Sequence, residues 1–110
     1  MNTEQEAEIL QLHAQICAGL ADPKRIMLLY ELAAGARNVT ELAAALDMPQ
    51  PLVSRHLKVL RERGMVTAER VGPAVRYHLA DERLIRALDL LREALREILA
   101  KRAMLMEAIG

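Results

Sequence analysis

The sequence predicts a mainly α-helical domain with one small β-hairpin, and three observations lead to this fold class. Apolar residues recur at helical spacing over most of the 110-residue chain. Pro and Gly residues divide this pattern into short segments. One stretch, residues 66–79, instead alternates between apolar and polar residues, as a half-buried hairpin does. A chain of this length fits a single domain, residues 1–110.

The first two helices are predicted over about residues 4–20 and from Pro23 to about Ala34. Asp22 supplies an N-cap side chain for the second helix, and Pro23 occupies a first-turn position where its missing N–H costs nothing. The apolar stripe of the first helix consists of Ile9, Leu12, Ile16 and Leu20. The inward positions expected in the second are Ile26, Leu29 and Leu32 or Ala33. Because the chain has no Phe or Trp, aliphatic side chains of this kind must build the core.

Two short helices joined by a tight polar linker are predicted next. Thr40 can cap the first of them, which spans about two turns. Pro51 restarts the chain in the first turn of the second, which reaches Arg63 and ends at Gly64. This arrangement is typical of a helix-turn-helix, here over about residues 40–63.

A β-hairpin and a long last helix complete the prediction. Apolar and polar residues alternate on either side of a turn containing Gly72 and Pro73, so residues 66–79 form the hairpin, or wing. The last helix covers about residues 82–104, with Asp81 as its cap. Its apolar residues repeat at steps close to a heptad: Leu84, Leu88, Leu91, Leu95 and Ile98. One small core cannot cover this stripe, so we expect a two-fold homodimer in which the first and last helices bury each other's stripes.

The charge of the chain is zero in total but uneven along its length. Residues 50–76 carry six Lys or Arg against two Asp or Glu, whereas residues 1–49 carry three against seven. No apolar run is long enough to span a bilayer, and the first residues are polar and acidic, so we expect a cytoplasmic protein without a membrane partner. The single cysteine, Cys17, excludes an intrachain disulfide and a multi-cysteine zinc site.

The residues do not suggest an enzyme. The three histidines are scattered, Ser54 is the only serine, and neither a Gly-rich phosphate loop nor a His and carboxylate cluster is present. We therefore predict no catalytic residues and no cofactor.

Three stretches of the sequence have a specific combination of motifs. They are LADPKRIMLLYEL at 20–32, VTELAAALDMPQPLVSRHLKVLRERGMV at 39–66 and VRYHL at 75–79. With the order of the elements, they make residues 9–100 resemble the ArsR/SmtB family of bacterial winged-helix repressors. The resemblance implies a homodimer that binds double-stranded operator DNA, blocks transcription and releases the DNA when an inducer binds. The alternative is a winged-helix protein-interaction or dimerisation module that does not bind DNA.

The outer face of the helix that begins at Gln50 is the predicted DNA-binding surface. Its apolar residues at i, i+4 and i+7 should face the core: Val53, Leu57 and Leu60. Because the start of the second helix of a helix-turn-helix enters the major groove, Gln50, Ser54 and Arg55 are predicted to reach base edges. The remaining predicted contacts, mainly to phosphate, are those of Lys58, Arg61 and His56 on this helix and of Arg70 and Arg76 beside the hairpin tip. For His56, contact with DNA or with the adjoining helix is favoured over a metal.

The family's usual sensor sites are missing from the sequence. Metal-sensing relatives carry a Cys-x-Cys pair where this chain has Ala43 and Ala45, and no His or Cys follows His78 to form a metal site on the last helix. His13 and Cys17, one turn apart on the first helix, remain as candidates for thiol chemistry or for a metal shared across a dimer. The alternative is that Cys17 is a small buried hydrophobe. The inducer stays open: a thiol-reactive species, a metal, a small organic molecule or none.

Overall fold

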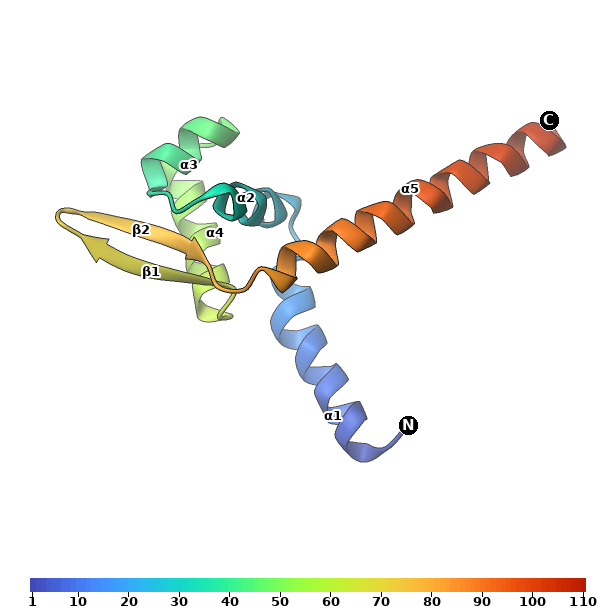
Figure 1. Ribbon diagram of the computed structural model, residues 1–110, viewed down its shortest axis with the longest axis horizontal. Coiled ribbons are helices and arrows are strands. Elements are labelled where there is room, and N and C mark those ends of the chain that lie inside the picture. The colour runs from blue at the N-terminus through green and yellow to red at the C-terminus, as the bar shows by residue number, and fades with distance from the viewer.

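The computed structural model describes all of residues 1–110 and has two helical arms that extend from a small core (Figure 1). The elements are α1 (Thr3–Leu12), a π-helical turn (His13–Cys17), α2 (Pro23–Ala34), α3 (Val39–Leu46), α4 (Gln50–Glu62), β1 (Val66–Val71), β2 (Ala74–Leu79) and α5 (Arg83–Ile109). The expected fold class, mainly α with a small hairpin in winged helix-turn-helix order, is confirmed. The radius of gyration is 17.3 Å, against roughly 13 Å for a compact domain of this length. The arms account for the difference.

The core lies where α2, α3, α4, the hairpin and the first turns of α5 meet. Eleven buried apolar side chains form it: Leu28, Leu29, Leu32, Leu42, Ala43, Val53, Leu57, Leu60, Met65, Val66 and Leu88. The three residues of α4 that periodicity places inward have no exposed surface, which confirms that prediction. In α2 the expected Leu29 and Leu32 are buried, but the sequence analysis missed Leu28, which is fully buried.

Side-chain caps define where the short core helices begin. The side chain of Asp22 accepts a hydrogen bond from the backbone N–H of Lys24 at 2.8 Å, as expected. The cap predicted for α3 was wrong by two residues. Asn38, not Thr40, accepts from the backbone N–H of Glu41, and the Glu41 side chain accepts from the backbone N–H of Asn38 in return. This reciprocal pair is a capping box, which satisfies two backbone donors at once.

The hairpin is held against the helical core on one edge. Its strands pair antiparallel, from Val66 opposite Leu79 to Val71 opposite Ala74. Beyond the hairpin, Tyr77 and Arg37 exchange two backbone hydrogen bonds of 2.8 and 3.1 Å. Because Arg37 lies between α2 and α3, these bonds fasten β2 to the helical layer, and the tip of the hairpin projects away from it (Figure 1).

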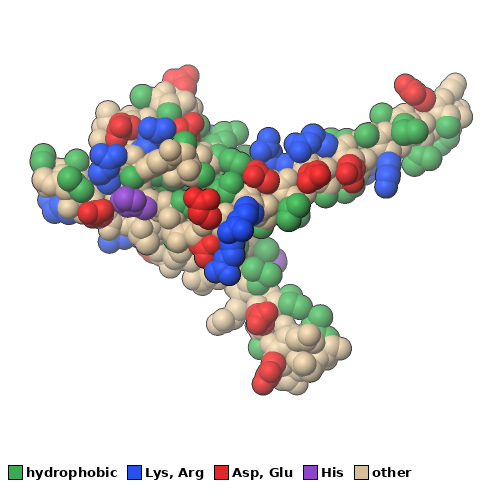
Figure 2. Space-filling model, in the orientation of Figure 1, with side chains coloured by type: hydrophobic (Ala, Val, Ile, Leu, Met, Phe, Trp, Pro, Cys, Tyr) green, Lys and Arg blue, Asp and Glu red, His purple; other side chains and the backbone are tan.

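The two arms differ in detail from the predicted helices. The helix expected over residues 4–20 is interrupted at its C-terminal end by the π turn, and the last helix continues beyond residue 104 to Ile109. Leu88 is the last buried residue of α5, and every residue after it is exposed. Hydrophobic side chains therefore line both arms at the surface (Figure 2). None of the helices has the length and apolar character needed to cross a membrane.

Candidate nucleic-acid interface

The outer face of α4 presents polar and positively charged side chains that have no partner in the chain. Gln50, Ser54, Arg55, Lys58 and Arg61 are all exposed, and no Lys or Arg among them takes part in an ion pair. The opposite face is anchored in the core. These five side chains are therefore positioned by a buried helix and remain free to contact an external ligand.

The N-terminus of α4 adds to the positive character of this face. Pro49 is its N-cap and makes no side-chain hydrogen bond, and the first turn contains no acidic residue. The helix dipole gives this end a partial positive charge. Pro51 has no N–H, and the N–H groups of Leu52 and Val53 both bond to the carbonyl of Pro49, so the N–H of Gln50 is the one left for an external acceptor such as phosphate.

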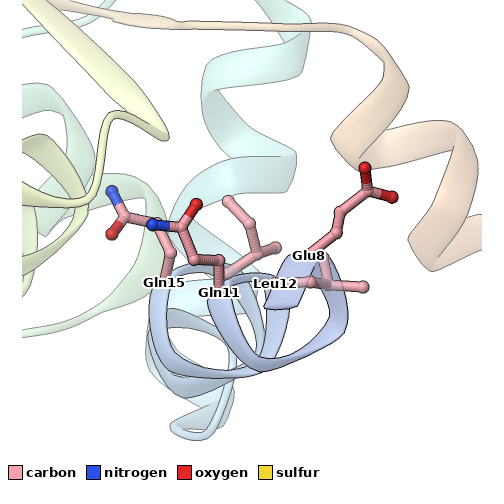
Figure 3. Close-up of a pocket in the computed structure, with 5 residues that line it drawn as sticks. Glu8, Gln11, Leu12 and Gln15 are labelled. Atoms are coloured by element: carbon pink, nitrogen blue, oxygen red, sulfur yellow. The ribbon is translucent and has the colours of Figure 1, made fainter. Parts of the chain in front are cut away.

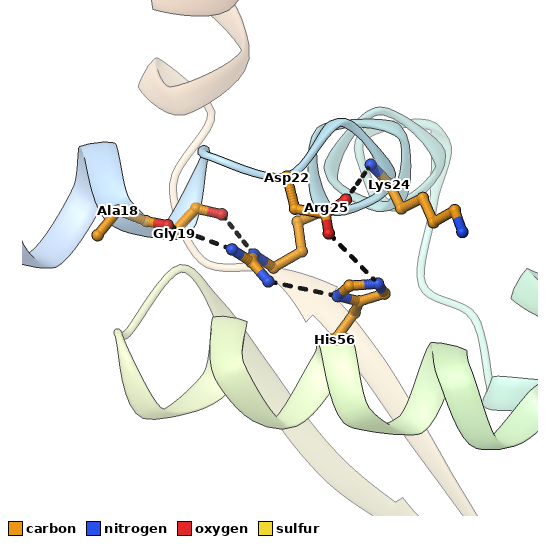
Figure 4. Close-up of polar contacts among 6 residues, drawn as sticks. All are labelled: Ala18, Gly19, Asp22, Lys24, Arg25 and His56. Carbon is orange, nitrogen blue, oxygen red and sulfur yellow. Dashed lines mark hydrogen bonds and ion pairs between the residues drawn. The ribbon is translucent and has the colours of Figure 1, made fainter.

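His56 does not belong to the exposed face, which corrects its assignment as a DNA contact. Only 8% of its surface is exposed, and its ring lies against the end of α1 and the start of α2 (Figure 4). Its Nδ1 is 3.4 Å from Nη1 of Arg25, and its Nε2 is 3.9 Å from Oδ2 of Asp22. The other expected contact, with an adjoining helix, is present, because Arg25 belongs to α2 and Asp22 caps it. The sequence carried the signal, because His56 is at i+3 from Val53 on the core face.

The neighbours of His56 define its protonation state. A guanidinium can only donate, so Nδ1 must accept from Arg25, and the ring proton belongs on Nε2, on the side of Asp22. Burial lowers the pKa of His56 below its usual 6.5, the charge of Asp22 opposes this, and the charge of Arg25 adds to it. The ring is therefore neutral in the folded protein near pH 7.

Replacing His56 by Gln is expected to make the free energy of unfolding depend less on pH below about pH 6.5. Since the folded-state pKa of His56 is lowered, the unfolded chain binds more protons below pH 6.5. The free energy of unfolding should therefore fall as the pH drops through 6.5, until the lowered pKa is passed. The Gln amide can accept from Arg25 but does not titrate. Urea unfolding of both proteins from pH 7.5 to 5 measures the difference, and parallel curves would contradict the buried neutral ring.

The two hairpin arginines differ in their availability. Arg70 is exposed and makes no ion pair, whereas Arg76 donates a 2.8 Å hydrogen bond from Nη2 to the backbone carbonyl of Ala36. Cross-strand pairing also places them apart, because Arg76 is opposite Glu69 and Arg70 is opposite Val75, on alternate faces of the hairpin. Arg70 is thus the free cation of the wing, and Arg76 fastens the wing to the loop after α2.

Two arginines contact the end of α1 and were given no role from the sequence. Arg25 of α2 donates to the carbonyls of Ala18 and Gly19, and Arg63 at the end of α4 donates to the carbonyls of Ala14 and Gln15. Arg63 was counted with the positive charge of residues 50–76, but it is only partly exposed. Sequence spacing carries no signal for these contacts, since the partners of Arg63 are nearly fifty residues away.

The candidate sensor residues lie in the π turn of the arm. His13 and Cys17 are both exposed in the single chain. The alternative, a Cys17 that is a small buried hydrophobe, depends on the dimer interface and stays open. The structure brings no group of three His, Cys, Asp or Glu residues together in a way that could hold a metal ion. A sensing role for either residue stays a prediction.

A shallow depression runs beside the sensor candidates along α1 (Figure 3). Its lining comes from this one helix: Glu8, Gln11, Leu12, Gln15 and Ile16. Small-molecule sites usually converge from several elements around an apolar pocket. This depression is an open surface of the arm and does not have the form of a small-molecule site.

Comparison with known proteins places the chain among bacterial transcription regulators. Residues 22–68 match the family model described as bacterial regulatory protein, arsR family. The HTH-type transcriptional repressor SmtB of Mycobacterium tuberculosis is 48% identical over 77 residues, which are 70% of this chain and 57% of that protein. The HTH-type transcriptional regulator NmtR of the same species is 40% identical over 82 residues, which are 72% of this chain and 68% of that protein. The chain thus matches little more than half the length of SmtB.

A solved structure agrees over nearly the whole chain. The homodimeric winged helix-turn-helix DNA-binding domain from Mycobacterium bovis superposes with a TM-score of 0.75 at 30% sequence identity. The alignment covers 90% of this chain and 91% of that one. The likeness therefore includes the arms as well as the core.

Proposed function

Because the chain belongs to the arsR family of bacterial regulatory proteins, we propose that it is a homodimeric repressor that binds double-stranded operator DNA and releases it when an inducer binds. The observation that carries this proposal is the outer face of α4, where five polar side chains are exposed on a helix fixed in the core. The similar proteins named above are transcription regulators, and one similar domain is homodimeric. A protein that binds operator DNA acts in the cytoplasm, because the bacterial chromosome lies there.

The residues divide into two kinds of DNA contact. Arg55, Ser54 and Gln50 lie in the first turns of α4, the part of a recognition helix that reaches base edges in the major groove. Arg reads guanine through two parallel hydrogen bonds, and Gln reads adenine in the same manner. Lys58 and Arg61 lie further along the same face and would contact phosphates, which set the register without reading sequence.

The wing would contact the DNA backbone beside α4. Arg70 is the residue for this role, because its guanidinium has no partner in the chain. Arg76 is exposed but already bonded to Ala36, so we assign it to holding the wing in place. The inducer is not identified by any residue cluster, and Cys17 with His13 remains the candidate for a thiol-based signal.

Replacing Arg55 by Ala is expected to weaken binding to a single half-site by about 5- to 150-fold, the loss of roughly 1–3 kcal/mol of a bidentate base contact, and to weaken binding of the dimer to the whole operator by more, because both half-sites lose the contact. Replacing Lys58 by Ala should instead weaken binding to all sequences alike and reduce the salt slope of the dimer by about two, because each protomer loses one phosphate contact. Fluorescence anisotropy with the promoter region and with random duplex DNA, over a salt series, measures both quantities.

The outcome separates DNA binding from the alternative module. A protein-interaction or dimerisation module would show no preference for its own upstream region over random DNA at moderate salt, and neither variant would change its binding. Arg86→Ala is the matched control, since Arg86 is an exposed arginine near the base of α5 without an ion pair. It should leave both affinities unchanged.

A further inference from the structure

The junction between α1 and α4 is built from donors that take up the last carbonyls of the arm. These carbonyls lie in or just after the π turn, where the regular helical hydrogen-bond pattern changes. Here Nη1 of Arg63 donates hydrogen bonds to the carbonyls of Ala14 and Gln15, the latter at 3.2 Å. In return, Nε2 of Gln15 donates to the carbonyl of Arg63 at 3.0 Å. The end of α4 and the π turn of α1 are thus joined in both directions.

A second attachment lies one turn further along the arm. Nε of Arg25 donates to the carbonyl of Gly19 at 2.7 Å, and its Nη2 donates to that of Ala18 at 3.3 Å (Figure 4). The remaining Nη1 faces Nδ1 of His56 in the middle of α4. Arg25 therefore joins the end of the arm to α4 through a single side chain.

The arm and α4 are tightly packed against each other as well as joined by hydrogen bonds. Gly19 is buried, and a Cβ at this position would lie 2.6 Å from Sδ of Met65 and 3.1 Å from Cδ of Arg63. A side chain at this position would force the side chains of Met65 or Arg63 to move. This packing is independent of the hydrogen bonds and restricts the same junction.

The two attachments on α4 are far enough apart to restrict its rotation. His56 and Arg63 are seven residues apart, which is about 10.5 Å along a helix and on nearly the same face. A single contact would let α4 rotate about that point relative to the arm. Two separated contacts restrict this rotation and define the direction of the α4 axis. In the proposed homodimer the arms form the interface, so the direction of α4 relative to α1 determines the separation of the two recognition helices.

We propose that Arg63 and Arg25 are positioning residues that transmit the orientation of the dimer arm to α4 and thereby set the half-site spacing that the dimer accepts. This inference rests on the proposed function. It assigns specificity to two arginines that need not touch DNA. The spacing of half-sites follows the separation of recognition helices, about one helical turn of DNA in related folds.

The direct test measures the distance between the two α4 helices without DNA. Cys17 is the only cysteine, so Ser54→Cys in a Cys17→Ser background carries one spin label on each recognition helix. Pulsed electron paramagnetic resonance on the full-length dimer gives the distribution of label distances. We expect a narrow distribution in this parent, a broader one after Arg63→Ala or Gln15→Ala, and no change after Arg86→Ala.

A second readout uses DNA. From a pool of randomised duplexes the unlabelled wild-type protein should select inverted repeats of one spacing, preferred about tenfold, or 1.4 kcal/mol, over spacings one base pair longer or shorter. Arg63→Ala should lose most of this preference and keep its half-site sequence, an effect that simple destabilisation would not produce.

The outcomes are distinguishable from a failure of the proposed function. An unchanged distance distribution in Arg63→Ala, or in Gln15→Ala should the first variant not dimerise, would overturn the positioning role. If the wild-type protein selects no DNA sequence, the repressor proposal fails, while the distance measurement on Arg63→Ala, and on Arg25→Ala in the same labelled parent, still decides whether each of the two arginines orients α4.

Discussion

Substitution of Leu95 by Glu in the middle of α5 is expected to separate the proposed homodimer into monomers. Leu95 is 52% exposed in the single chain and belongs to the stripe that includes the buried Leu88. Burial of one such side chain contributes roughly 1.5–3 kcal/mol, and two-fold symmetry removes it twice. About half of each Leu95 side chain is left for the interface to bury, so the dimer dissociation constant should rise at least about tenfold, before the cost of burying the charge is counted.

Sedimentation equilibrium measures this change, and operator binding should weaken with it because only one half-site is engaged at a time. Ala100→Glu is the matched control. Ala100 is exposed on α5 and lies about 180° around the helix from the Leu91 position of the stripe. It adds the same charge away from the apolar stripe and should leave the dimer intact. A Leu95→Glu variant that remains dimeric would place the interface elsewhere.

Replacement of Leu57 by Ala is expected to destabilise the domain by about 2–5 kcal/mol. Leu57 has no exposed surface and lies on the core face of α4. Truncation leaves a cavity in a core of eleven side chains, and a small domain has only about 5–15 kcal/mol of stability in total. The Tm should fall by at least about 10 °C.

Urea unfolding at fixed protein concentration measures this loss, since the stability of a dimer depends on concentration. Leu57→Met is the control because it nearly conserves side-chain volume and should cost less than about 1.5 kcal/mol. Equal stability of the Ala and Met variants would contradict the packing of α4. DNA affinity should fall in step with the folded fraction for Leu57→Ala, whereas Arg55→Ala should lose affinity at unchanged stability.

Local patterns were sufficient to predict most of the fold. The three inward residues of α4 follow from helical periodicity, and the hairpin follows from alternation with its bounds correct at both ends. The cap of α3 was misplaced because Asn38 and Thr40 are both good cap residues, and only the return bond from Glu41 distinguishes them. The family prediction is confirmed by the match to the arsR model and by relatives at 40% identity and above.

The predicted DNA-binding surface was less uniform than its charge suggested. Arg55 and Arg63 belong to the same basic stretch, yet Arg55 is exposed and Arg63 donates hydrogen bonds to two carbonyls of the π turn. His56 is neutral and turned toward Arg25. Charge counted along a sequence does not show which side chains a distant helix end will engage.

The sequence by itself determined the elements of this protein, because helical period, alternation, caps and turn residues are local properties. It also determined which face of α4 is anchored, since apolar spacing and burial coincide there. Only the tertiary structure decided the orientation of α4 relative to the arm. The contacts of Arg63 with Ala14 and Gln15, and of Arg25 with His56, join residues far apart in the chain. They depend on which side chains the folded chain brings beside the end of the arm, and sequence spacing does not show this.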